Sequence, residues 1–169
     1  MEPLFENKYS WTRKMLREMN YRVYRPWLIV IGTIAALMLA LLVFASVKTS
    51  TPFVQYLSLP VVIFFVIAVL YMFLPLYSAV MTYSRMAKLY ESAPDVTVRF
   101  FEDRFIDFTR QSDAKLDLQY AQITKVMETN SLLLVKLKGR FVIMIDKNGF
   151  TRGSADGLRV FLREKMRSR

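Results

Sequence analysis

Three basic residues lie close together at the middle of the largely apolar stretch LLLVKLKGRFVIMIDK, residues 132–147. A chain reversal at Lys138-Gly139 would place Lys136, Lys138 and Arg140 at the tip of a β-hairpin. A basic tip can contact anionic lipid headgroups or a protein partner. It can equally be a solvated turn whose lysines keep sheet edges from pairing. The residues themselves leave these interpretations open.

Few other residues in the chain offer chemistry. The chain has no Cys and no His, which excludes thiol nucleophiles, imidazole bases and Cys/His zinc sites. Its five glycines form no phosphate-binding loop. We therefore expect no cofactor, no small-molecule substrate and no enzyme, with an enzyme acting on lipid as the remaining alternative. Four carboxylates fall in turns or at usually solvated strand positions and predict no metal site: Asp103, Asp107, Asp113 and Asp117.

Charge is distributed very unevenly along the 169 residues. Residues 1–26 carry six basic and three acidic groups, residues 27–84 carry Lys48 alone, and residues 85–169 carry seventeen basic and eleven acidic groups. An almost uncharged middle between two basic flanks is typical of a membrane protein rather than of a nucleic-acid-binding protein. The LLLVKLKGRFVIMIDK stretch is not a further span, since three charges at its centre would oppose insertion.

The uncharged middle contains two stretches long enough to cross a bilayer, residues 27–47 and 57–83. The connecting segment 48–56 has one basic residue, whereas basic residues precede the first span and follow the second. The positive-inside rule then places both termini in the cytosol and residues 48–56 outside. We expect a multi-pass protein of the cytoplasmic membrane.

Several local features accompany the predicted spans. Residues 1–26 are an amphipathic, basic segment, in which YSWTRKMLREMNYRVYR predicts a helix in the headgroup region, or a plain topology signal. Residues 84–95 predict a helical extension that stops before Pro94, and Pro75 predicts a kink. Small residues recur every four positions in the first span and suggest packing against the second span, a partner or a second copy: Gly32, Ala36 and Ala40.

The remainder, residues 96–169, predicts a small soluble domain. Apolar and polar residues alternate over several short segments separated by turn residues, which predicts six or seven antiparallel strands. A helix capped by Ser154 or Asp156 follows, with Leu158, Phe161, Leu162 and Met166 on one side. The fold class is thus α+β: a transmembrane helical hairpin, then a bent antiparallel sheet or partly open barrel with a C-terminal helix. The arrangement looks like a pleckstrin-homology (PH) superfold.

Particular segments in this region resemble a known family. The FFEDRF turn, the LQYAQITKVMET segment, the IDKNGF ending and the LRVFL helix resemble the C-terminal domain of the YcxB-like family of small bacterial membrane proteins. The resemblance covers roughly residues 96–166. It implies a bacterial membrane protein with a PH-like cytosolic domain, and it implies no activity and no functional residues.

These observations lead to two functional hypotheses. In the first, the protein is a non-enzymatic membrane-anchored module that presents a PH-like domain at the inner leaflet to a protein partner, with anionic lipid as a further candidate. In the second, the helical hairpin is an accessory or immunity-type subunit that packs against another membrane protein, or against itself, through the small-residue stripe. Neither hypothesis involves nucleic acid.

Overall fold

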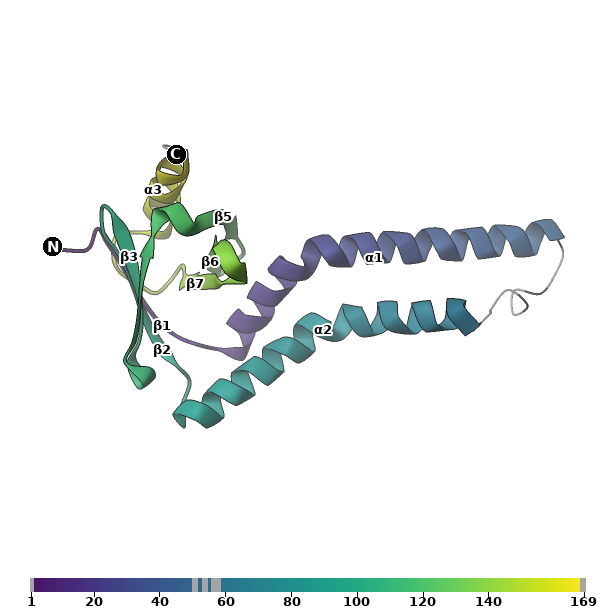
Figure 1. Ribbon diagram of the computed structural model, residues 1–169, viewed down its shortest axis with the longest axis horizontal. Helices are drawn as coiled ribbons and strands as arrows, with labels where there is room; N and C mark the ends of the chain where they lie inside the picture. The colour runs from purple at the N-terminus through teal and green to yellow at the C-terminus, as the bar shows by residue number, and fades with distance from the viewer. Residues whose placement is uncertain (1, 50–51, 53–54, 56–58, 168–169) are drawn as a thin grey trace.

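In chain order, the two long helices lie between two strands that are paired neighbours in one β-sheet (Figure 1). The chain is described by a computed structural model that covers residues 2–49, 52, 55 and 59–167, with side chains except at Leu59, Pro60, Ala114 and Arg140. The elements, in chain order, are β1 (Phe5–Ser10), α1 (Arg13–Thr49), α2 (Leu59–Tyr90), β2 (Asp95–Phe100), β3 (Arg104–Thr109), η2 (Arg110–Ser112), β4 (Ala114–Gln119), η3 (Tyr120–Gln122), β5 (Ile123–Glu128), β6 (Leu132–Leu137), η4 (Lys138–Arg140), β7 (Val142–Asp146), β8 (Phe150–Arg152) and α3 (Ala155–Arg167).

The helices α1 and α2 are both long and apolar enough to cross a membrane. At 1.5 Å per residue, the 37 residues of α1 extend about 55 Å, well beyond the roughly 30 Å of bilayer hydrocarbon. Both helices bend on the side nearer the sheets (Figure 1), and each contains one proline, Pro26 or Pro75, the residue that most often kinks a helix. Near the bends, the Asn20 side chain of α1 donates hydrogen bonds to two groups of α2, the Pro75 carbonyl (3.3 Å) and Ser78 Oγ (2.9 Å).

The strands form two antiparallel sheets that enclose the main core. The five-stranded sheet has the order β4-β3-β2-β1-β8, and the three-stranded sheet has the order β5-β6-β7. Large apolar side chains from both sheets and from α3 meet between them: Val98, Phe100, Phe105, Leu133, Val135, Ile145, Leu158 and Leu162. The predicted apolar side of the C-terminal helix therefore faces this core, and Ser154 Oγ caps that helix by accepting a hydrogen bond from Gly157 N.

The N-terminal strand β1 is held in the domain by unusually close contacts. It pairs with β2 along its whole length and with β8 on its other side. Asn7 is fully buried, and its side chain donates to Asp146 O and accepts from Asp146 N, so it bridges the two sheets. A Cβ on Gly149 would lie 2.5 Å from the Lys8 carbonyl oxygen. The absence of a side chain at Gly149 is therefore what allows β1 to approach.

The second sheet is covered on both faces. Leu133 and Val135 of β6 point into the main core, whereas Leu132 and Leu134, with Met144 of β7, pack against Met15 and Leu16 of α1 and Ala79 of α2. This explains why the stretch at 132–147 is nearly as apolar as a membrane segment: β6 alternates between two buried faces rather than between core and solvent.

Most of the predicted elements after residue 84 are present. The helix α2 ends at Tyr90, before Pro94, and seven strands followed by a helix occupy residues 95–167. The hairpin turns at η4, where Gly139 has a φ of 82°. The short helical turn predicted at Tyr120 is η3.

The interpretation of residues 1–26 requires correction. Residues 5–10 are a strand of the five-stranded sheet, so the β-sheet domain is built from both ends of the chain and does not begin at residue 96. A helix does begin at Arg13, but Met15 and Leu16 are covered by the second sheet rather than free to lie on lipid. The reason is that Leu132, Leu134 and Met144 offer this face an apolar surface within the same chain.

The small-residue stripe also differs from expectation. The half-buried positions in the uncharged part of α1 are 28, 31, 35, 38, 42, 45 and 46, and their spacing, mostly of three and four, defines the face towards α2. Gly32, Ala36 and Ala40 lie off that face and are exposed, and a Cβ on Gly32 would meet no atom within 4 Å. The prediction that the stripe packs against the second span is therefore wrong, because a different set of residues occupies the interhelical face. Packing against a partner or a second copy stays a prediction.

Candidate functional site

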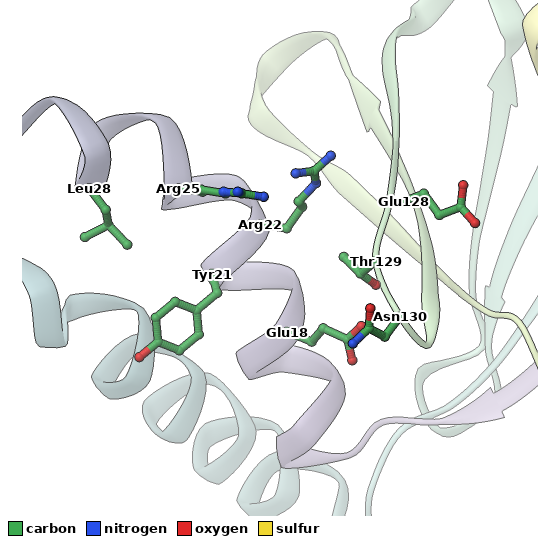
Figure 2. A pocket seen from close by; sticks show the side chains of 8 residues that line it. All are labelled: Glu18, Tyr21, Arg22, Arg25, Leu28, Glu128, Thr129 and Asn130. Atoms are coloured by element: carbon green, nitrogen blue, oxygen red, sulfur yellow. The ribbon is translucent and has the colours of Figure 1, made fainter.

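Two grooves lie side by side where α1 passes the second sheet. The first, which we call the Glu18 groove, has a volume of about 490 Å³ and is shown in Figure 2. The second, the basic groove, has a volume of about 300 Å³. Both are lined by Arg22 and Arg25. The other residues of the Glu18 groove are Glu18, Tyr21, Leu28, Glu128, Thr129 and Asn130, and those of the basic groove are Val23, Pro26, Ile29, Lys125, Met127 and Lys136.

In the Glu18 groove, Glu18 links α1 to the turn between β5 and β6. Its carboxylate accepts hydrogen bonds from Ser131 N (3.0 Å) and Ser131 Oγ (2.5 Å). Burial raises the pKa of Glu18, but these hydrogen bonds outweigh burial and hold the pKa below its ordinary value. The carboxylate therefore stays ionised near neutral pH and fixes α1 against the second sheet.

The other carboxylate of the Glu18 groove is already engaged elsewhere. Glu128 pairs with Lys147 (2.7 Å) and Arg159 (3.1 Å), and these hydrogen bonds lower its pKa. Figure 2 shows its side chain directed away from Arg22. Glu128 therefore does not neutralise the two arginines.

The basic groove is lined by four cationic side chains and no carboxylate. Arg22 and Arg25 lie one helical turn apart on α1, and Lys125 of β5 is the direct cross-strand partner of Lys136 of β6. Like charges in such a pair repel each other. Arg22 and Lys136 are half-buried, whereas Arg25 and Lys125 are exposed. This arrangement concentrates positive charge at one place and can bind an anion.

The structure separates the three basic residues predicted to act together. Lys136 lines the basic groove, whereas Lys138 is exposed in the turn η4. Arg140 lies in the same turn, and its side chain is outside the described part of the chain. The sequence interpretation missed Arg22, Arg25 and Lys125 as companions of Lys136. A signal was present, since Arg22, Arg25 and Ile29 have the three- and four-residue spacing of one helix face immediately before the first predicted span.

The four aspartates do not form one cluster, although Asp103 and Asp117 line the same pocket. Asp117 is exposed and pairs with Arg104 at 3.3 Å, and Asp113 adopts a φ of 49° at the end of η2. Asp107 is half-buried, and burial raises its pKa to about 6. Within the described residues, no three His, Cys, Asp or Glu side chains are grouped so that they could hold a metal ion.

Comparison with known proteins identifies one similarity. Residues 100–162 match the model of the family described as YcxB-like protein, so the predicted family resemblance is confirmed over those residues. No curated protein and no solved structure matches the chain significantly.

Proposed function

From the YcxB-like match over residues 100–162 and the insertion of the helix pair between β1 and β2, we propose that this protein is a membrane-anchored binding module without enzymatic activity. The helical hairpin crosses the cytoplasmic membrane of a bacterium. The domain is PH-like and is presented at the inner leaflet to a protein partner. The arrangement of β1–β4 in one sheet and β5–β7 in another, closed by α3, supports the PH-like description.

One observation carries this proposal: β1 and β2 are paired neighbours, and each connects directly to one helix. Only residues 11–12 and 91–94 separate strands from helices, and Trp11 N donates to the Pro94 carbonyl at 3.0 Å. The domain is thus fixed to its anchor rather than tethered by a flexible linker. It also follows that residues 5–10 and 95–152 lie on the same side of any membrane that the helices cross, and the basic flanks favour the cytosolic side.

A second candidate function is favoured by the exposed stripe. Gly32, Ala36 and Ala40 leave a smooth strip on α1 that α2 does not cover. Small residues allow close helix approach within a membrane. An accessory or immunity-type subunit would bind another membrane protein along this strip.

In-cell photocrosslinking separates the two candidates. A photoreactive residue at Lys138 should yield a discrete protein adduct if the domain binds the partner, and this adduct should be lost with Arg140→Glu, in the same turn, but kept with Gly32→Leu. A photoreactive residue at Ala36 should instead yield the adduct if the stripe binds it, with the opposite response to the two substitutions. If neither position yields a discrete protein adduct and both crosslink to lipid alone, both candidates are contradicted.

A further inference from the structure

We propose that the basic groove binds the phosphate group of an anionic phospholipid from the leaflet beside the domain. This inference rests on the membrane insertion proposed above and assigns a ligand to a site on the domain's membrane-facing side. The phosphate would be held by Arg22, Arg25, Lys125 and Lys136.

The first argument is uncompensated charge. In the part of the chain that the structure describes, no ion pair involves any of these four side chains. Nε of Arg22 is buried and has no hydrogen-bond partner. A buried guanidinium nitrogen without an acceptor is unfavourable. Because Lys125 and Lys136 also face each other directly, an anion in the groove would relieve both the repulsion and the missing hydrogen bond.

The second argument is the apolar part of the lining. Val23, Pro26, Ile29 and Met127 complete the groove, and Pro26 and Ile29 flank the start of the uncharged stretch at Trp27. A free phosphate would gain nothing from these side chains, whereas a lipid can place its phosphate on the cations and its glycerol and first methylenes on the apolar residues. The volume of about 300 Å³ is at the lower limit of ligand pockets, which suits a headgroup rather than a whole lipid.

The third argument is the position of the groove along the helix. The start of β6 packs near Met15 and Leu16 of α1, and its end, at Lys136, lies against residues 22–29. The strand β6 therefore advances along α1 towards the predicted span, and Figure 1 shows this end of the domain nearest to the apolar lengths of the helices. Basic pockets at this level are where proteins hold anionic headgroups. Phe141, 69% exposed just after η4, is an aromatic residue of the kind enriched at such interfaces.

Native mass spectrometry of the full chain, purified in a neutral detergent, tests this assignment. We expect phosphatidylglycerol to remain bound at concentrations where phosphatidylcholine does not. Arg25→Gln and Lys125→Gln should each weaken phosphatidylglycerol binding about fivefold, since a basic group near an anionic headgroup contributes about that factor. Arg99→Gln, on β2 and outside both grooves, is the matched control and should change nothing.

Competition identifies the source of the phosphate. Inorganic phosphate, glycerol 3-phosphate and a short polyglutamate peptide, each at millimolar concentration, should displace little bound lipid. Arg25→Lys should keep binding within about twofold, because Lys and Arg contribute similarly near an anionic headgroup. That result would show that the Gln variants lose charge rather than folding. Equal retention of the two lipids, unchanged binding in both Gln variants, or efficient displacement by the phosphates or the peptide would overturn the assignment. The purified sample contains no protein partner, so a failure of this lipid assignment can be told apart from a failure of the proposed function, which a missing protein adduct at Lys138 would show.

Discussion

Replacing Gly149 by alanine should destabilise the folded domain by about 3 kcal/mol. The added Cβ would lie 2.5 Å from the Lys8 carbonyl oxygen and 3.3 Å from Asn7 Nδ2. The nearest atom belongs to the backbone of β1, so the clash is relieved only if the strand moves away from β8. That movement would also break the Asn7 hydrogen bonds to Asp146, whose distances are 2.7 and 3.2 Å.

Guanidinium unfolding of the detergent-solubilised full chain would measure the effect. Trp11 packs against both core clusters, so its fluorescence reports on the domain when Trp27 is replaced by phenylalanine in every variant. Gly32→Ala is the matched control, because a Cβ there meets nothing within 4 Å and should leave the domain transition unchanged. Equal midpoints for the two alanine variants would contradict the docking of β1.

Replacing Asp107 by asparagine should stabilise the protein by about 2 kcal/mol at pH 8. Asp107 lies on β3 opposite Val98 and Leu116, and its buried Oδ1 has no hydrogen-bond partner. Burial raises its pKa from 3.8 to about 6. The folded state therefore binds the proton more tightly than the unfolded state, and the free energy of unfolding falls as pH rises from about 4 to about 6. A neutral amide removes this loss.

The pH dependence distinguishes this effect from a general gain in stability. The advantage of Asp107→Asn should be present at pH 8 and should disappear near pH 4, where the aspartate is protonated in the folded state. Asp117→Asn, an exposed carboxylate on the neighbouring strand, should change stability by less than about 1 kcal/mol. Guanidinium midpoints at the two pH values provide the comparison. An advantage for Asp107→Asn that is the same at both would show that the carboxylate does not titrate as described.

The strands after residue 95 could be predicted from the sequence because their pattern is local. Alternation in β2 and β3, the turn residues between them and the Ser154 cap each depend on neighbours a few residues away. The strand β1 was missed because FENKYS carries a buried asparagine in the middle of its inward-facing set, Phe5, Asn7 and Tyr9. Its partner β2 is about 90 residues distant, and single-sequence patterns carry no information about such a pairing.

The same limit explains the candidate site. Lys136 was recognised as part of a basic cluster, but its neighbours Arg22 and Arg25 belong to α1 and were interpreted as topology signals. Only the packing of Leu132, Leu134 and Met144 on α1 brings these groups together. The two buried faces of β6 could not be separated by periodicity, because every residue from Leu132 to Val135 is apolar.

Disulfide crosslinking between β1 and β2 tests the central claim, that both ends of the chain form one domain around the inserted helices. The chain has no native cysteine, and Lys8 is the direct partner of Thr97. Paired positions in antiparallel strands are close enough for a disulfide.

In native membranes, Lys8→Cys with Thr97→Cys should form a disulfide, so that cleavage at a protease site placed after Pro52 leaves the two fragments joined until reductant is added. The control pair is Lys8→Cys with Lys115→Cys, whose strands β1 and β4 are three strands apart, a separation of about 14 Å. This pair should form no disulfide, so the two fragments should separate without reductant. Release of the fragments from both pairs would contradict the account.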